Sequence, residues 1–401
     1  MNLGSKALIR YVLVIVIVFF VGISARTRAA GQTADQNPAP SDQKPVMAED
    51  VFKNIQLLRG IPVKEFMDTM GFFSASTGMN CIDCHSPQAA DSMAAYAIDT
   101  PLKQTTRKMI LMVRQLNQQN FGGQLRVTCY TCHRATDRPK NIPSLADQYA
   151  IQADDPNEVE VVETPEGQSK PTNQVSPDQI INKYIAAVGG AAQLAKLTSF
   201  VAKGTYEGFD SYGEKVPIEM FAAAPDKLTT VIHNQEADSV STFDGMNGWV
   251  AASDKLMRVL PLKGGDLEGA KLDASVSFPA AIKKDFTWQT GFPSVTINNH
   301  AVQVIQVAGA GRTGAKLYFD KLSGLLVRQV RYSDTAVGVI PSQVDYSDYR
   351  LVAGVKMPFH LVYTWTDGRS VVQLTTIQPN VRIDAARFDM PAPPKAKIAT
   401  P

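Results

Sequence analysis

Strong charge of one sign is missing from this sequence. Lysine and arginine number 40 against 38 aspartate and glutamate residues, which leaves a formal net charge of +2 at pH 7. Nucleic-acid-binding proteins usually present a strongly basic face, which this balance does not indicate. The sequence therefore predicts no nucleic-acid partner.

Long hydrophobic runs are also scarce. The run from Tyr11 to Ile23 is shorter than the ~20 apolar residues of a membrane-spanning helix. Two cations precede it and small residues follow it, namely Lys6, Arg10, Ala25, Ala29 and Ala30. This pattern is typical of a secretory signal, so we expect residues 1–30 to be a signal peptide and the mature protein to be periplasmic or otherwise extracytoplasmic. An uncleaved membrane anchor is the alternative interpretation.

Cysteine is rare, and its placement is informative. All four cysteines lie in Cys-x-x-Cys pairs followed by histidine: Cys81-Ile-Asp-Cys84-His85 and Cys129-Tyr-Thr-Cys132-His133. This is the attachment pattern of c-type haem, in which the thiols bond to the haem vinyl groups and the imidazole ligates the iron. Zinc knuckles or disulfides are the alternatives, but a histidine after both pairs has a chance of about 1 in 10,000 on composition. We expect two covalently bound haem c groups.

The scarcity of histidine bears on the sixth iron ligand. There are five histidines in 401 residues, and only His85 and His133 precede His233. Methionine is the alternative axial ligand, and its thioether raises the reduction potential. Met67 and Met70 precede the first motif and Met109 and Met112 the second, each pair on one helical face. Gap-filling core methionines are the alternative, but we expect one ligand from each pair.

Composition divides the rest of the chain. Stretches rich in proline and acidic or polar residues separate two regions that can fold. We expect a flexible linker at 31–48, an all-α diheme cytochrome domain at 49–150, a linker at 151–177, an antiparallel β domain at 178–392 and a tail at 393–401.

The expected elements follow from periodicity and turn residues. Helices are predicted over Ala48–Leu58, from Pro62 onward, from Thr100-Pro101 to Gly122, and over Asp178–Leu197 with Ile180, Ile181, Tyr184 and Ile185 facing inward. Strands are predicted at Val201–Tyr206, Val302–Val307, Lys316–Phe319 and Leu325–Tyr332, and a hairpin turns at Asp367-Gly368.

Two segments between Val51 and Ser144 contain the cysteine motifs, namely FKNIQLLRGIPVKEFMDTMGFFSASTGMNCIDCH and RKMILMVRQLNQQNF…VTCYTCHR. These residues resemble the photosynthetic reaction-centre cytochrome c subunit family. The family's repeated unit is a helix with an axial methionine, a turn and Cys-x-x-Cys-His. The resemblance implies Met70 and Met109 as axial ligands, with Met67 and Met112 as runners-up. The family's best-known members carry four haems, whereas this chain has two motifs.

The region after Asp178 more loosely resembles the outer-membrane lipoprotein carrier and sorting family (LolA/LolB-like). The features are Gly189-Gly190, the Phe243-Asp244-Gly245…Gly248-Trp249 turn and the Asp348–Phe359 hairpin. The resemblance implies an antiparallel β half-barrel (α+β) with a cavity for acyl chains. An ordinary packed core, filled by Trp249, Trp288 and Trp365, is the alternative.

These features together predict an electron carrier and not a substrate-converting enzyme. Its partner would be a redox protein or a membrane-bound photosynthetic or respiratory complex, and its β domain would bind an apolar ligand or an envelope component. The alternatives are a lipid or lipoprotein carrier with accessory redox haems, a diheme peroxidase with an open sixth site, and a structural envelope protein.

Overall fold

The computed structural model describes residues 45–144, 155–158, 175–253, 255, 257–290, 295–307 and 314–391. All of them belong to one compact unit, Gln43–Pro401. The predicted signal peptide, the tail and most of both predicted linkers lie outside the described residues. None of the helices formed by the described residues is long and apolar enough to cross a membrane.

Helical elements of different lengths make up the described region that holds both cysteine motifs. They are α1 (Ala48–Val51), α2 (Val63–Thr77), α3 (Cys81–Cys84), η1 (Pro87–Ala90), η2 (Met93–Ala97), α4 (Pro101–Asn120) and α5 (Cys129–His133). The predictions for α2 and α4 are confirmed: Pro62 precedes α2, and the Thr100 side chain caps α4 by accepting the Lys103 N–H at 3.2 Å.

Two predicted helices are shorter than expected. The first ends at Val51 and not at Leu58, because Phe52 is extended and Asn54 has a positive φ of 60°. The helix expected over Asp178–Leu197 is divided into α7 (Pro177–Ala187) and α8 (Ala191–Leu194). Gly189 and Gly190 break it with φ values of 134° and 84°, in the region that favours glycine.

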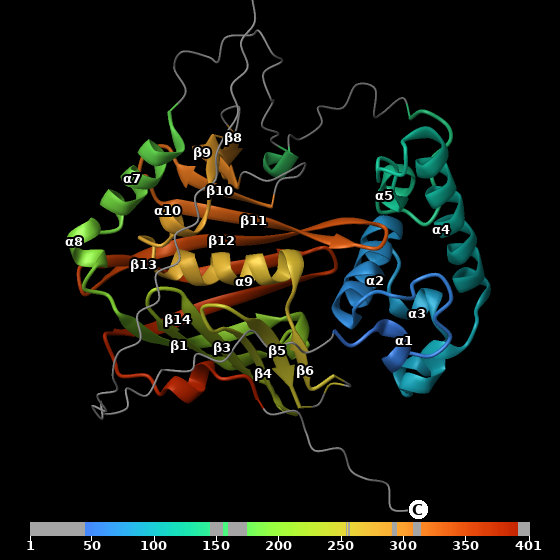
Figure 1. The fold of residues 1–401 in the computed structure, drawn as a ribbon, viewed down its shortest axis with the longest axis horizontal. Coiled ribbons are helices and arrows are strands. Elements are labelled where there is room, and N and C mark those ends of the chain that lie inside the picture. The colour runs from blue at the N-terminus through green and yellow to red at the C-terminus, as the bar shows by residue number, and fades with distance from the viewer. Residues whose placement is uncertain are drawn as a thin grey trace, which may run out of the picture. The chain divides into compact units, whose positions relative to one another are not determined.

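The C-terminal region is built on one open, 14-stranded sheet within the described residues (Figure 1). Its strands are β1 (Ser199–Gly208), β2 (Lys215–Ala223), β3 (Lys227–His233), β4 (Asp238–Phe243), β5 (Gly248–Ala252), β6 (Val259–Pro261), β7 (Trp288–Thr290), β8 (Val295–Ile297), β9 (His300–Val307), β10 (Ala315–Asp320), β11 (Leu326–Thr335), β12 (Gly338–Val352), β13 (Val355–Trp365) and β14 (Gly368–Pro379).

Hairpins between consecutive strands make up most of the sheet, and the pairing of β1 with β14 joins its two halves. The order is β6-β5-β4-β3-β2-β1-β14-β13-β12-β11-β10-β9-β7, with β8 paired to β9, and every pairing is antiparallel. The predicted Asp367-Gly368 hairpin is confirmed, since Trp365 pairs with Gly368. The pairs Phe243–Gly248 and Val352–Val355 confirm the other two predicted turns.

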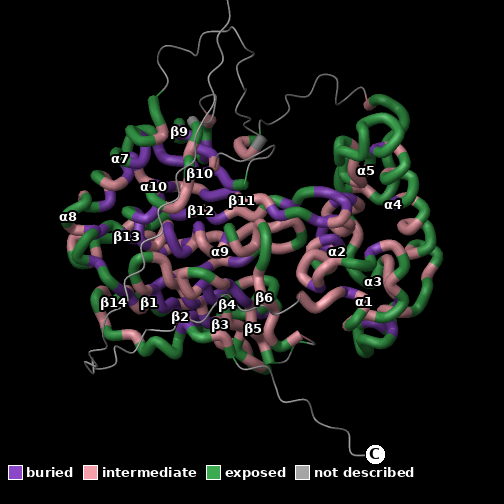
Figure 2. The backbone as a smooth tube through the Cα atoms, in the orientation of Figure 1, coloured by how far each residue is buried: buried purple, intermediate pink, exposed green. Residues whose placement is uncertain are grey.

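Helices cover one face of the sheet and close the core. Figure 1 shows α9 (Gly264–Ser277) running across this face, and α10 (Ile282–Asp285) follows it. Leu272 of α9, Ile282 of α10 and Ile181 of α7 share one apolar cluster with the strands. Figure 2 shows buried residues concentrated in the strands, whereas most of α4 is not buried. The predicted fold class, helical region plus open antiparallel sheet with helices, is confirmed.

One part of the second predicted linker lies against the other face of the sheet. Residues Pro156–Glu158 form a short 3-10 helix. The Asn157 carbonyl accepts hydrogen bonds from Lys316 Nζ at 2.8 Å and Tyr332 Oη at 3.2 Å, and Tyr318 Oη donates to the Pro156 carbonyl at 3.0 Å. This short segment is therefore fixed to β10 and β11.

Candidate haem sites

The first cysteine pair lies in a single helical turn that its own neighbours cap. Asn80 Oδ1 accepts the N–H groups of Ile82 and Asp83 at 3.0 and 3.2 Å, and Asp83 Oδ2 accepts the Asn80 N–H at 2.8 Å. This reciprocal capping allows a helix of four residues to persist. His85 follows as the C-cap residue, and its N–H bonds to the Cys81 carbonyl.

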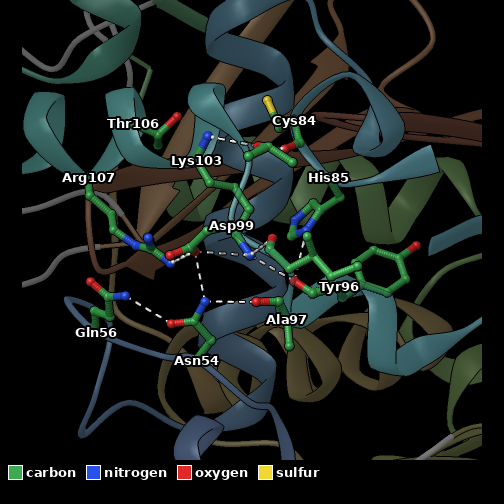
Figure 3. Close-up of polar contacts among 12 residues, drawn as sticks. Asn54, Gln56, Cys84, His85, Tyr96, Ala97, Asp99, Lys103, Thr106 and Arg107 are labelled. Carbon is green, nitrogen blue, oxygen red and sulfur yellow. Dashed lines mark hydrogen bonds and ion pairs between the residues drawn. The ribbon is translucent and has the colours of Figure 1, made fainter. Parts of the chain in front are cut away.

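The imidazole of His85 is oriented by the loop that leads into α4 (Figure 3). His85 Nδ1 lies 3.3 Å from the Tyr96 carbonyl oxygen, and the two rings are 4.9 Å apart. Lys103 Nζ donates to the same carbonyl and to that of Ile98, each at 2.8 Å. Burial, followed by the nearby Lys103 charge, lowers the pKa of His85 and so favours the neutral imidazole.

Ion pairs and an amide hold this loop in place. Asp99 Oδ1 accepts hydrogen bonds from Arg107 at 2.8 Å and from the Asn54 side chain at 2.7 Å. Asn54 also donates to the Ala97 carbonyl at 2.8 Å. The hydrogen bond from Arg107 is the main reason that the pKa of Asp99 is lowered. These hydrogen bonds connect the loop that contacts His85 to α4 and to the turn after α1.

The second motif repeats this arrangement with different residues. Thr131 Oγ1 accepts the Thr128 N–H at 3.0 Å at the start of α5. His133 Nδ1 lies 3.0 Å from the Thr136 carbonyl oxygen, and Thr136 Oγ1 donates to the His133 carbonyl at 2.5 Å. Both imidazoles are therefore positioned by a backbone carbonyl that follows them in the chain.

These contacts determine which imidazole nitrogen is available. A carbonyl oxygen only accepts hydrogen bonds, so Nδ1 of His85 and of His133 must carry the proton. In the neutral imidazole this leaves the lone pair on Nε2 of both side chains. A backbone carbonyl bonded to Nδ1–H is a common way to orient a metal-binding histidine. The two histidines fit the role of proximal haem ligand.

The cysteine sulfurs fit the role of attachment points. None of the four forms a disulfide, and Cys81 and Cys132 are exposed. Burial raises the pKa of Cys84 and of Cys129, which keeps both as neutral thiols. No cluster of three or more metal-ligating side chains forms within the described part of the chain. The cysteines are thus not gathered as a four-cysteine zinc site requires.

The candidate methionines differ in exposure. Met67 and Met112 are exposed, with 50% and 48% of their surface accessible, whereas Met70 and Met109 are half-buried. A sulfur that ligates a haem iron sits in an apolar pocket. Met79 is a further sulfur at the first motif, because its Sδ lies 3.7 Å from Cys84 Sγ.

The two motifs are neighbours in space, joined through α2. The Ala135 N–H, just after the second motif, donates to the Ser76 carbonyl at 2.9 Å. Gly78 approaches so closely that a Cβ there would be 2.5 Å from the Ala135 oxygen. A cavity of about 480 Å³ lies here, lined by Ser74, Ala75, Gly78, Met79, Asn80, Tyr130, Ala135 and Thr366.

Several residues of the site were not predicted from the sequence. A backbone carbonyl takes part in each contact made by Lys103, Tyr96 and Thr136. A sequence motif does not indicate where such a carbonyl will lie. The capping pair of Asn80 and Asp83 did leave a signal, since this spacing just before a short helix is typical of a capping box.

Comparison with known proteins agrees with the resemblance seen in the sequence. The profile of the family "Photosynthetic reaction centre cytochrome C subunit" matches residues 22–186. A photosynthetic reaction center cytochrome c subunit from Thermochromatium tepidum is 33% identical over 115 residues, which is 28% of this chain and 27% of the relative. One from Rubrivivax gelatinosus is 30% identical over 127 residues, or 30% of this chain and 33% of the relative. The chain thus spans about a third or less of the length of these relatives.

Solved structures are also similar to this chain, at low sequence identity. A LolA superfamily protein from Nitrosomonas europaea covers 54% of this chain and 99% of its own, with a TM-score of 0.38 and 13% identity. A putative outer membrane lipoprotein-sorting protein domain from Vibrio parahaemolyticus covers 53% and 95%, with a TM-score of 0.37 and 10% identity. The match of the family profile shows that residues 22–186, which contain both cysteine motifs, are similar to photosynthetic reaction centre cytochrome c subunits.

Proposed function

We propose that this protein is an extracytoplasmic c-type cytochrome that carries two covalent haems and transfers single electrons. The observation that supports it most strongly is that both Cys-x-x-Cys-His motifs form a short helix capped at its start, with each histidine Nδ1 bonded to a backbone carbonyl. The similarity of residues 22–186 to reaction centre cytochrome c subunits supports it independently.

The chain's own residues supply what a haem site needs. Cys81 and Cys84 would attach one haem and Cys129 and Cys132 the other. His85 and His133 each present Nε2 as the proximal ligand, and their Nδ1–H bonds increase the basicity of that nitrogen. The bound haem supplies an iron that alternates between the ferrous and ferric states.

A sixth ligand from methionine supports an electron carrier over an enzyme. Met70 and Met109 are half-buried residues on the helices that lead into the two motifs. Thioether ligation at both irons leaves no open site for peroxide or another substrate, and it favours rapid one-electron exchange. The donor and acceptor would be redox proteins or a membrane-bound electron-transfer complex, as the resemblance implies.

The proposal does not extend to an acyl-chain ligand in the sheet region. The sheet face that such a ligand would need is packed by α9, whose Asp273 forms an ion pair with Arg331 and accepts a hydrogen bond from Gln329 at 2.6 Å. Gln329 and Leu272 are fully buried. An acyl chain would have to displace this helix and its buried polar contacts, which is costly.

An optical redox titration of the full-length protein, produced in a host that matures c-type cytochromes, tests the proposal. We expect two one-electron waves and a spectrum that is low-spin in both oxidation states. Replacing His85 or His133 by alanine should remove one low-spin component each. A high-spin haem with an open site in the wild-type protein would favour the peroxidase alternative and contradict the carrier.

A further inference from the structure

The turn between β11 and β12 lies against the second cysteine motif. Phe72 of α2 and Val337 and Ile340 of the hairpin form one buried apolar cluster, and Cys129 packs against it. Val337 is 6% exposed. A cysteine expected to hold a haem therefore packs against a cluster that includes residues of the β11–β12 hairpin.

The contact is built into the turn. Thr335 Oγ1 accepts the N–H groups of Val337 and Gly338 at 3.3 and 3.0 Å and donates to the Gly338 carbonyl at 2.8 Å. The Ala336 N–H donates to Thr69 Oγ1 of α2 at 3.3 Å. A Cβ on Gly338 would lie 2.4 Å from the Phe72 ring, so only glycine allows this approach.

The same turn forms part of a cavity beside Cys129. The cavity has a volume of about 270 Å³. Its apolar lining includes Ile110, Val113, Cys129, Ala336 and Val337, and on the α4 side it is also lined by Arg114, Asn117 and Gln118. A haem vinyl group bonded to Cys129 would start from this wall. The hairpin turn and α4 therefore line the same cavity as Cys129.

We propose that the β11–β12 turn, through Val337, is the apolar wall of the site for the haem attached at Cys129 and Cys132. This inference rests on the proposed function. Ferric haem carries one more positive charge than ferrous haem, and apolar surroundings disfavour the more highly charged state. By excluding water and polar groups from this side, Val337 raises the reduction potential of that haem, so a residue of the sheet region adjusts the redox site.

The test is a redox titration of the full-length diheme protein with Val337→Thr. Threonine has nearly the shape of valine but places a hydroxyl at the cavity wall. We expect the wave of the second haem alone to move to lower potential, so that its reduced-to-oxidised ratio at the wild-type midpoint falls by about threefold or more. Val339→Thr is the matched control, because Val339 lies on the same hairpin but is 39% exposed, and it should move neither wave.

A second variant at Val337, and the assignment of each redox wave to one haem, make the possible outcomes distinguishable. Val337→Ser also removes volume and should lower the same wave further. The waves are assigned with variants that keep only one haem, Cys81→Ala/Cys84→Ala and Cys129→Ala/Cys132→Ala. A protein with two covalent haems in which neither Val337 variant moves the second wave, or in which both waves move equally, overturns this inference and leaves the proposed function standing. A protein without covalent haem overturns both.

Discussion

Methionine sulfurs are the side chains we expect opposite His85 and His133. Replacing Met70 or Met109 with leucine keeps the volume and should cost little packing. We expect each variant to lose the far-red sulfur–iron charge-transfer band of one oxidised haem and to lower the potential of that haem. The spectrum of the oxidised protein measures the first effect and a redox titration the second.

The exposed methionines of the same helices are the matched controls. Met67→Leu and Met112→Leu should leave both bands in place, because these side chains are about half accessible. If a band is lost in a control and kept in its partner, the ligand lies one turn away on the helix. If none of the four variants changes the spectrum, methionine ligation from α2 and α4 is wrong.

Lys103 places a cation next to the first haem site. Its ammonium group shares the Tyr96 carbonyl with His85 Nδ1 (Figure 3). Burial and the neighbouring Arg107 charge lower the pKa of Lys103. A positive charge at this position still destabilises the ferric state of the haem relative to the ferrous state. Lys103→Gln should lower the first haem's potential, with an expected change of about two- to tenfold in the reduced-to-oxidised ratio, where tenfold is about 59 mV for one electron.

The control for this variant lies on the same helix. Lys108 is exposed on α4, so Lys108→Gln removes a charge in a solvent-screened position and should change the potential much less. Equal effects of the two substitutions would show that net charge, and not the position of Lys103, sets the potential.

At the scale of elements, the break between α7 and α8 shows how glycine limits a helix. The Lys356 N–H donates to the Val188 carbonyl at 2.8 Å, which joins the β12–β13 turn to the end of the helical stretch. Gly189 has φ 134°, and a Cβ there would be 2.4 Å from the Gly354 oxygen, whereas Gly190 has φ 84° and open space. Gly314 has open space and no positive φ.

The surroundings of these three glycines predict how much stability each glycine-to-alanine variant loses. Gly314→Ala should be nearly neutral, Gly190→Ala should cost about 1 kcal/mol from backbone strain, and Gly189→Ala should cost about 2–4 kcal/mol from strain plus overlap. Urea denaturation of each variant measures the free energy of unfolding. An unaffected Gly189→Ala protein would mean that the β12–β13 turn does not approach this site as closely as described.

The sequence predicted long elements and turns more accurately than contacts between elements. The α4 start at Thr100-Pro101 and the Asp367-Gly368 hairpin are local signals, and both are confirmed. The apolar pattern of Asp178–Leu197 continues through Gly189, so periodicity alone missed the break. The packing of Cys129 against the cluster of Phe72, Val337 and Ile340 joins residues far apart in the chain, and no local pattern encodes it.

At the scale of the whole molecule, the helical and sheet regions are joined by apolar and ionic contacts. The Phe72, Val337 and Ile340 cluster is buried, and Lys64 lies 3.4 Å from Asp266 of α9. We predict that a specific protease site inserted between Gln168 and Ser169, in the predicted linker, can be cut without separating the two regions. The cleaved protein should elute from a sizing column at the position of the intact one.

A variant and a salt series complete this experiment. Val337→Asp places a charge in the apolar cluster and should make the cut fragments separate into a haem-containing and a colourless piece. Raising the salt concentration should separate the cut fragments less than Val337→Asp does. The reason is that a partly exposed ion pair, such as Lys64–Asp266, contributes little to the stability of the contact. Spontaneous separation of the wild-type fragments in low salt would contradict a stable contact between the regions.

The count of covalently bound haems tests the central claim most directly. Intact-mass measurement of the full-length protein from a host with cytochrome c maturation should show the polypeptide plus two haems, with no thiol left to react among Cys81, Cys84, Cys129 and Cys132. Extraction with acidified organic solvent should leave the colour with the protein. A mass without haem, a single haem, or colour that moves into the solvent would contradict the account of this chain as a diheme c-type cytochrome.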